Sequence, residues 1–170
     1  MPHPSYDIGM TYWAGYDSPI GLVLAASDHK GIIAIGLGEK ERAFLSRLAS
    51  PVERPALFSA LFRGFDEYFR GKPVEFKVAL SLKGSSFDRV VWRALQKIRW
   101  GRVKSYGEIA GIIGKPKAAR AVGGACGRNP VPLIIPCHRV LASGGRPGGF
   151  SCGIEIKKKL LEIEGIGYRL

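Results

Sequence analysis

The sequence predicts an α+β protein of two domains, a small sheet-and-helix domain over residues 1–80 and a mostly helical domain over residues 81–170. Three observations lead to this prediction. Apolar runs of strand length gather before residue 40, and helical apolar stripes with capping signals dominate after residue 85. The charge balance also changes near residue 81. Residues 1–80 carry nine Lys or Arg and nine Asp or Glu, whereas residues 81–170 carry 17 and five.

The excess of basic residues gives a net charge of +12, all of it in the second domain. A basic domain points to a polyanionic partner, and nucleic acid is the first candidate. The alternative is a basic surface without a function. No apolar run is long enough to span a bilayer, and the first residues lack the pattern of a signal peptide. Three cysteines do not make a disulfide framework. We therefore expect a cytoplasmic protein with no membrane partner.

Amide side chains are nearly absent, because Gln96 and Asn129 are the only Gln and Asn in the chain. This depletion is one trait of proteins from hot environments, so it suggests a thermophilic source.

The first domain should contain a β-hairpin, two helices and a less defined segment. Two apolar runs separated by polar turn residues predict the hairpin, and apolar residues at helical spacing predict the helices. The last segment fits either a short strand or a linker. The ranges are 20–26 and 31–35 for the strands, 39–48 and 55–69 for the helices, and 76–82 for the segment.

The second domain should open with three helices. Ser85 and Ser86 cap an apolar stripe that continues to Ile98, and Ser105 with Glu108 forms a capping-box pattern before the next helix. Pro116 suits the first position of a third helix. Two short helices joined by a Gly-containing turn predict a helix-turn-helix.

The helix expected from Pro116 to about Cys126 is built almost entirely from small residues, with Arg120 as its one long central side chain. Small residues allow close helix packing, which is the simpler interpretation. They also allow a helix to enter a narrow groove, where Arg120 could fill the space left by a rotated base.

The second domain should end with a glycine-rich loop and a helix. Residues 143–153 contain five glycines, and their backbone N–H groups together with Ser151 could bind a planar heterocycle. Residues 154–164 predict the final helix, with the Lys157–Lys159 run mostly turned outward.

A cysteine and a histidine stand side by side at Cys137 and His138, after the apolar run Leu133–Ile135. The run predicts a short buried strand that ends at Pro136 and leads to a turn at the cysteine. A thiolate is a nucleophile, and nearby imidazole or cationic groups lower the pKa of a thiol. Cys137 is therefore a candidate nucleophile. The alternative is a buried structural cysteine with a basic neighbour by chance.

Three stretches, in their order and spacing, resemble the O6-alkylguanine-DNA alkyltransferases. They are Arg120–Ala125, Asn129–Pro132 and Ile135–Val140. The match covers about residues 85–165, whereas the first domain is similar to that family only in size and general character. The resemblance implies a protein that flips a damaged guanine out of duplex DNA and moves its O6-alkyl group irreversibly onto a cysteine. Alkyl transfer needs a soft, activated nucleophile, which a thiolate supplies.

The resemblance also implies roles for individual residues. Cys137 would be the alkyl acceptor, and His138 would act as its base through a water, oriented by Glu164. Tyr106 would donate a proton or a hydrogen bond to the guanine, and Asn129 would brace the turn.

The same resemblance assigns two further sets of residues. Those expected at the DNA are Ser105, Tyr106, Arg120, Ala121, Gly123, Gly124 and Arg128. Those expected around the base are Pro132, Val140, Phe150, Ser151, Cys152 and Gly153.

The sequence departs from the family pattern at several positions. Gly127 precedes Arg128, whereas many relatives have the reverse order. Phe150 stands where some relatives have tyrosine. The cysteines that hold zinc in some relatives are absent, so we expect no metal and no cofactor. We expect Cys126 and Cys152 to be thiols rather than a disulfide.

The resulting prediction is a monomeric repair alkyltransferase whose partner is double-stranded DNA containing O6-alkylguanine. Two other classes remain as alternatives. One is a non-enzymatic sensor or regulator that binds alkylated DNA through the same helix-turn-helix, and the other is a cysteine hydrolase that uses Cys137 and His138.

Overall fold

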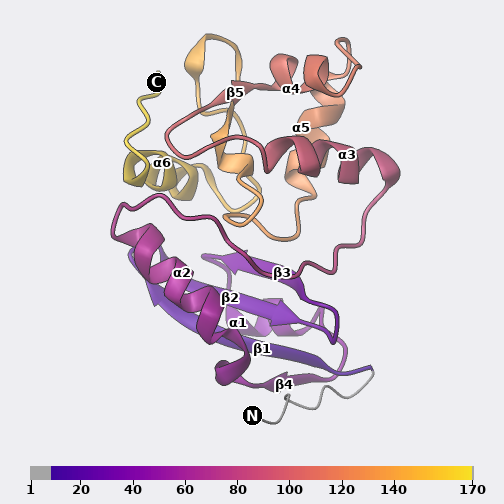
Figure 1. The fold of residues 1–170 in the computed structure, drawn as a ribbon, viewed down its shortest axis with the longest axis vertical. Coiled ribbons are helices and arrows are strands. Elements are labelled where there is room, and N and C mark those ends of the chain that lie inside the picture. The colour runs from indigo at the N-terminus through magenta and orange to yellow at the C-terminus, as the bar shows by residue number, and fades with distance from the viewer. Residues whose placement is uncertain (1–8, 170) are drawn as a thin grey trace. The chain divides into compact units, whose positions relative to one another are not determined.

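The structure is a computed structural model that describes residues 9–169. It divides into two compact units, Met1–Lys83 and Gly84–Leu170. Figure 1 shows strands concentrated in the first unit and helices in the second. None of the described helices is long and apolar enough to cross a membrane.

The N-terminal unit is built on a four-stranded sheet with the spatial order β3-β2-β1-β4. Strands β1, β2 and β3 pair antiparallel, and β4 pairs parallel to β1. The predicted hairpin is confirmed as β2 and β3, whereas β1 and β4 were not predicted. The strands are β1 (Thr11–Ser18), β2 (Gly21–Ser27), β3 (Ile32–Leu37) and β4 (Pro51–Glu53).

Two helices and a 3-10 turn accompany the sheet in the described part of this unit. The predicted helical stripe is confirmed in α2, where Leu61, Phe65 and Tyr68 are buried. The hydroxyl of Tyr16 on β1 donates to Asp66 of α2 at 2.8 Å, which joins this helix to the sheet. The elements are α1 (Glu41–Leu45), η1 (Pro55–Phe58) and α2 (Ser59–Phe69).

The segment 76–82 is not a regular strand. Leu80 forms a single parallel bridge with Ile32 at the edge of β3, where the Ile32 N–H donates to the Ala79 carbonyl at 2.8 Å. The segment is therefore extended chain that contacts the sheet at one point.

The C-terminal unit contains four helices and a two-stranded parallel sheet. The helix cap predicted at Ser85 is present at the start of α3, where Ser85 and Asp88 form a capping box, and the capping box predicted at Ser105 with Glu108 is present at the start of α4. The elements are α3 (Ser86–Leu95), β5 (Lys104–Ser105), α4 (Tyr106–Ile112), α5 (Ala119–Gly127), η2 (Cys137–Arg139), β6 (Val140–Leu141), η3 (Ser143–Gly145) and α6 (Ile154–Ile163).

Helices α4 and α5 are the two helices expected for the helix-turn-helix, and α3 supports them. The indole N–H of Trp92 on α3 donates to the Ala125 carbonyl of α5 at 2.9 Å. The predicted start of α5 at Pro116 is wrong. Pro116 lies in a turn closed by the Ala118 N–H and the Lys115 carbonyl at 2.8 Å, a position where its fixed φ is favourable.

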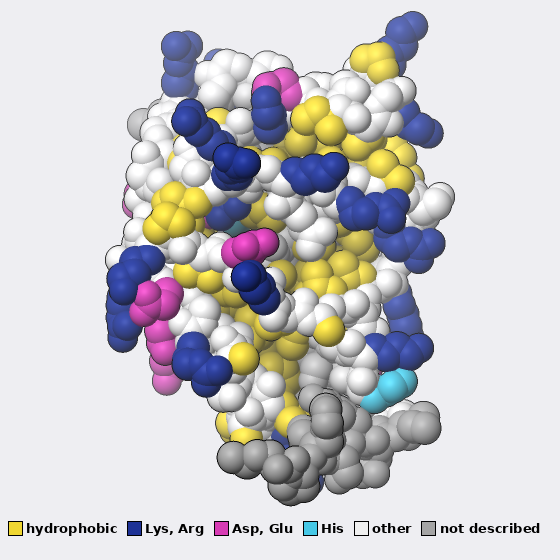
Figure 2. Space-filling view, viewed as in Figure 1, with side chains coloured by type: hydrophobic (Ala, Val, Ile, Leu, Met, Phe, Trp, Pro, Cys, Tyr) yellow, Lys and Arg dark blue, Asp and Glu magenta, His cyan; other side chains and the backbone are white. Residues whose placement is uncertain are grey.

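The prediction that Lys157 faces outward with its neighbours is also wrong. Lys157 is completely buried, whereas Lys159 is exposed. The three residues occupy different faces of α6, since successive helical residues are about 100° apart. Figure 2 shows many Lys and Arg side chains at the surface on this face of the molecule, several of them in the upper part of the view.

Candidate active site

Cys137 begins a 3-10 turn rather than following a strand. The apolar run Leu133–Ile135 forms a tight turn with one isolated bridge between Pro132 and Ile135, so the predicted strand is wrong. Leu133 has a φ of 77°, a left-handed conformation that no regular strand contains. The expected turn at the cysteine is present as η2, and the short strand β6 follows it instead of preceding it.

The buried side chain of Asn129 explains this turn. Its Nδ2 donates to the Ile135 carbonyl at 2.8 Å and to the Cys137 sulfur at 3.1 Å, and its Oδ1 accepts from the Val131 N–H at 3.1 Å. These bonds replace partners that a strand would have found in a sheet. One amide therefore fixes both the backbone of the turn and the position of the sulfur.

His138 and Arg139 share one buried carboxylate. His138 Nε2 lies 2.7 Å from Glu164 Oε1, and both side chains are completely buried. Arg139 donates to the same carboxylate at 2.8 and 3.0 Å and to the Ile98 carbonyl at 2.6 Å. Glu164 caps the C-terminal end of α6, so this helix positions the imidazole.

The electrostatics keep the resting cysteine neutral. Burial raises the pKa of the Cys137 thiol to about 12, and the hydrogen bond from Asn129 opposes that rise only in part. The sequence argument that adjacent basic residues lower this pKa does not hold in the resting site, because Arg139 and His138 Nε2 are both turned to Glu164. The thiol must therefore lose its proton when a substrate is present.

Burial also lowers the pKa of His138, which keeps the imidazole neutral at pH 7. Burial alone would raise the pKa of Glu164, but hydrogen bonds and charges from His138 and Arg139 lower it to about 2. A neutral imidazole held by a carboxylate is suited to accept a proton.

The parallel pairing of β5 with β6 brings Tyr106 to the same site. Ser105 pairs with Leu141, so Tyr106 at the start of α4 lies close to the segment that follows Cys137. Burial raises the pKa of Tyr106 to about 12, with smaller contributions from the thiols of Cys126 and Cys137. The phenol is therefore protonated at pH 7 and available as a donor.

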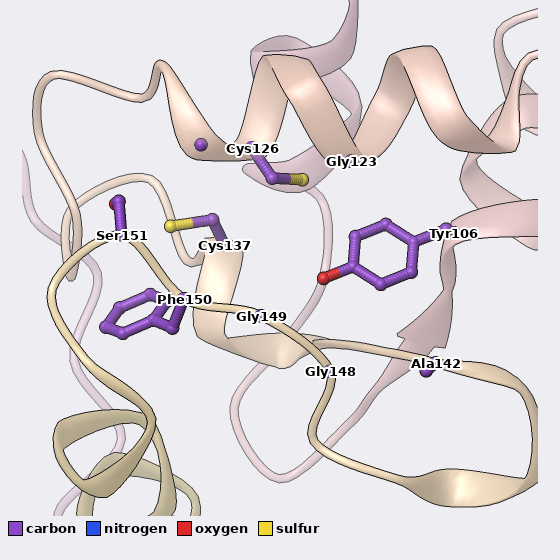
Figure 3. A pocket seen from close by; sticks show the side chains of 10 residues that line it. Tyr106, Gly123, Cys126, Cys137, Ala142, Gly148, Gly149, Phe150 and Ser151 are labelled. Carbon is purple, nitrogen blue, oxygen red and sulfur yellow. The ribbon is translucent and has the colours of Figure 1, made fainter.

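A cavity of about 450 Å³ opens beside the sulfur. Figure 3 shows the Tyr106 hydroxyl directed toward the side of the cavity where Cys126 and Cys137 lie, with the glycine-rich segment on the facing wall. A Cβ added at Gly148 would lie 3.4 Å from the Tyr106 hydroxyl, and its φ of +69° also favours glycine. The lining residues are Tyr106, Gly123, Cys126, Gly127, Cys137, Ala142, Gly148, Gly149, Phe150 and Ser151.

The structure brings only part of the predicted base-binding set to this cavity. Phe150 and Ser151 line it. Pro132 and Val140 are buried outside the lining. Cys152 and Gly153 follow the lining segment and lead into α6 without being part of the wall.

Two family models match this chain. The 6-O-methylguanine DNA methyltransferase, ribonuclease-like domain matches residues 11–82, and the 6-O-methylguanine DNA methyltransferase, DNA binding domain matches residues 86–166. The chain belongs to the O6-methylguanine DNA methyltransferase family. The resemblance inferred from the sequence is thereby confirmed, and it extends to the first domain.

Relatives named methylated-DNA–protein-cysteine methyltransferase are similar to nearly the whole chain. The protein of Methanosarcina acetivorans is 41% identical over 154 residues, which cover 91% of this chain and 98% of that protein. The protein of Sulfolobus acidocaldarius is 44% identical over 158 residues, covering 92% and 95%. The crystal structure of Mycobacterium tuberculosis OGT in complex with DNA has a TM-score of 0.81 at 40% identity, covering 90% and 92%. These similarities support the methyltransferase and do not favour the sensor.

The residues predicted at the DNA lie on α4 and α5 or beside them. Arg120 and Ala121 are exposed on α5, whereas Gly123 faces the cavity. Gly124 is half-buried on α5. Ser105 caps α4, and its hydroxyl accepts from the Glu108 N–H at 3.1 Å.

Arg128 forms an ion pair within the C-terminal unit. Its guanidinium is 2.7 Å from Asp88 of α3, although more than half of the side chain remains exposed. The hydrogen bond from Arg128 holds the pKa of the Asp88 carboxyl below its usual value. This pair joins the end of α5 to the capping box of α3.

Sequence reasoning missed three features of the site. Cys126 is a largely buried thiol in the cavity wall, and burial raises its pKa to about 11. Arg139 is a buried partner of Glu164, and Lys157 lies behind the glycine-rich segment. The apolar spacing of α6 contained one signal, since Lys157 falls three residues before Leu160 and four before Leu161, both on the inward face.

Proposed function

We propose that this protein repairs DNA by direct reversal, moving the O6-alkyl group of guanine irreversibly onto the sulfur of Cys137. The observation that supports this most is a nucleophile, a buried base and a proton donor arranged at one cavity. Cys137 lines the cavity, and Tyr106 lies across from its sulfur. His138 follows Cys137 in the same turn and is hydrogen-bonded to Glu164. Each chain acts once, because the new thioether cannot release the alkyl group.

The transfer begins with removal of the thiol proton. With a proton on Nε2 facing Glu164, the neutral imidazole of His138 has its lone pair on Nδ1 and accepts the Cys137 proton through a water. The Asn129 amide donates to the sulfur and stabilises the developing thiolate. Glu164 stabilises the imidazolium that forms.

The sulfur then attacks the alkyl carbon as the bond from that carbon to O6 breaks. Electrons flow into the purine ring, and guanine leaves as a neutral base once it has gained a proton. Tyr106 supplies that proton or a strong hydrogen bond, because its phenol is protonated and its hydroxyl points into the cavity. The proton taken by His138 later restores the phenol, so no proton is gained or lost overall.

The substrate guanine must leave the DNA stack to reach this cavity. Extruding a base costs a few kcal/mol, which contacts with the rest of the duplex must offset. We assign these contacts to the exposed face of α5, with Arg120 filling the space left in the stack. Arg128 remains sufficiently exposed to approach a phosphate while paired with Asp88.

The partner we propose is therefore double-stranded DNA containing O6-alkylguanine, bound by a monomer in the cytoplasm. Basic residues of the second domain would hold the phosphates, so affinity should fall steeply with salt. We assign a structural role to the first domain, residues 1–80, and DNA binding and alkyl transfer to residues 81–170.

Intact-mass analysis after incubation with an O6-methylguanine duplex tests this function. One added methyl group per chain is expected, located on Cys137 by peptide mapping. Cys137→Ala should gain no methyl group and still bind DNA, whereas Cys126→Ala, which removes the other thiol of the cavity, should still be methylated. Damage-specific binding without any modification would favour the sensor instead, and repeated turnover would contradict an irreversible acceptor.

A further inference from the structure

Lys157 is a completely buried lysine at the active site that the mechanism above does not use. Lysine is among the residues least often fully buried, because its charge must be desolvated. Its ammonium donates to the Val140 carbonyl at 2.6 Å and to the Gly149 carbonyl at 3.4 Å. The next residues of α6, Lys158 and Lys159, remain at the surface, so only this lysine points inward.

The two carbonyls belong to different walls of the reaction site. Val140 begins β6 directly after the turn that contains Cys137. Gly149 lies in the cavity wall between Gly148 and Phe150. The segment 146–153 contains no helix or strand. The Lys157 ammonium therefore links the cavity wall at Gly149 to Val140, the residue that follows the turn of Cys137.

The ammonium also places a positive charge near both thiols of the cavity. It lies 6.0 Å from the ring centroids of Tyr106 and of Phe150. Its charge opposes, in part, the rise that burial causes in the pKa values of Cys137 and Cys126. The same charge adds to the effect of burial in lowering the pKa of His138, which favours a neutral base.

We propose that Lys157 is a positioning residue for alkyl transfer, which fixes the Gly149 wall over the cavity and supplies the buried positive charge that stabilises the Cys137 thiolate. This inference rests on the proposed function. It explains why a helix with two surface lysines directs a third into the interior, where an apolar residue would bury at lower cost.

The charge of this lysine should make the transfer rate depend on pH. Burial lowers the pKa of Lys157 to about 8, so the ammonium is protonated at pH 7 and loses its proton as the pH rises through about 8. The titratable groups on other elements that interact with it are Cys137 and His138 of η2, Cys126 of α5 and Tyr106 of α4. Cys137, Cys126 and Tyr106 have pKa values of about 11 or 12, well above that of the lysine.

The test compares single-turnover alkylation by the full-length protein and its variants, with an O6-methylguanine duplex and with free O6-benzylguanine. Lys157→Met should slow both reactions at pH 7 by about a hundredfold, the lower end of the effect of removing one preorganised donor. Lys157→Arg keeps the charge and should recover part of the rate. The matched control is Lys159→Met, which removes an exposed charge from the same helix and should leave the rate with the free base unchanged.

The pH profiles distinguish electrostatic positioning from simple packing. The logarithm of the wild-type rate should bend downward near pH 8, and this bend should be absent in Lys157→Arg, because arginine stays protonated. A wild-type profile without the bend, or equal rates for wild type and Lys157→Met, would overturn the inference. If Lys157→Met fails to fold, the wild-type and Lys157→Arg profiles still decide. Absence of any alkyl group on wild-type Cys137 would instead refute the proposed function.

Discussion

Replacing Glu164 with Gln should destabilise the C-terminal unit by about 3–5 kcal/mol, the usual effect of removing one partner of a buried ion pair. The carboxylate has no exposed surface and receives hydrogen bonds from Arg139 at 2.8 and 3.0 Å. Glutamine has nearly the same shape, but its NH2 group would face N–H donors. Arg139, which is 8% exposed, would become a buried cation without a counterion.

The pKa of Glu164 gives a second measure of the same interactions. It is lowered from its ordinary value of 4.5 to about 2. Since each pKa unit corresponds to 1.36 kcal/mol, the ionised carboxylate stabilises the fold by about 3 kcal/mol. A carboxyl whose pKa is lowered by folding gives its full stabilisation above pH 4.5. That stabilisation is lost as the pH falls through about 2.

Urea unfolding followed by hydrogen exchange on peptides from residues 84–169 would measure this effect for the C-terminal unit alone. Wild-type stability should fall between pH 5 and pH 2, and Glu164→Gln should lose most of that dependence. Glu162→Gln is the matched control, because Glu162 is an exposed residue of the same helix that accepts only the Tyr168 hydroxyl among the hydrogen bonds described, at 2.9 Å. A loss below about 1 kcal/mol in Glu164→Gln, or an unchanged pH dependence, would refute the reasoning.

Three further predictions concern the transfer reaction. Tyr106→Phe should slow alkylation by about a hundredfold to a thousandfold, the range expected for one acid or hydrogen-bond donor, while DNA affinity measured by fluorescence anisotropy stays within about twofold. An unchanged rate would exclude the phenol as proton donor. Arg120→Ala should slow repair of duplex DNA more than reaction with free O6-benzylguanine in single-turnover assays, and equal losses would argue against a role in base extrusion. Asn129→Ala should lower the unfolding free energy by about 2–5 kcal/mol in urea titrations, because the buried Val131 N–H and Ile135 carbonyl lose their partner. A stable variant that still alkylates at the wild-type rate would show that Asn129 does not brace the turn.

The local signals in the sequence were sufficient where a short segment determines its own structure. The capping boxes at Ser85 and Ser105 fixed the starts of α3 and α4, because their hydrogen bonds join residues three apart. The hairpin of β2 and β3 and the apolar stripe of α2 follow from periodicity in the same way. Strand β1 was missed because it is central in its sheet and buries four successive residues, so it shows little alternation.

The site was only partly accessible to sequence reasoning. The motif around Cys137 identified the family, and the order of residues placed His138 beside the cysteine. Periodicity assigned Leu133–Ile135 to a strand, but Asn129 supplies the hydrogen bonds that a strand would need. A local pattern cannot show that a side chain four to six residues away competes for the same backbone groups.

The amino-acid sequence by itself determined the class of protein, Cys137 as its candidate nucleophile and most helices, because these depend on residue identity and on contacts within one or two turns. Only the tertiary structure decided the protonation states of the site residues and the burial of Lys157 and Arg139. Both properties depend on desolvation and on partners 17 and 25 residues away in the chain. Burial is a property of the packed unit, so no short stretch of sequence can specify it.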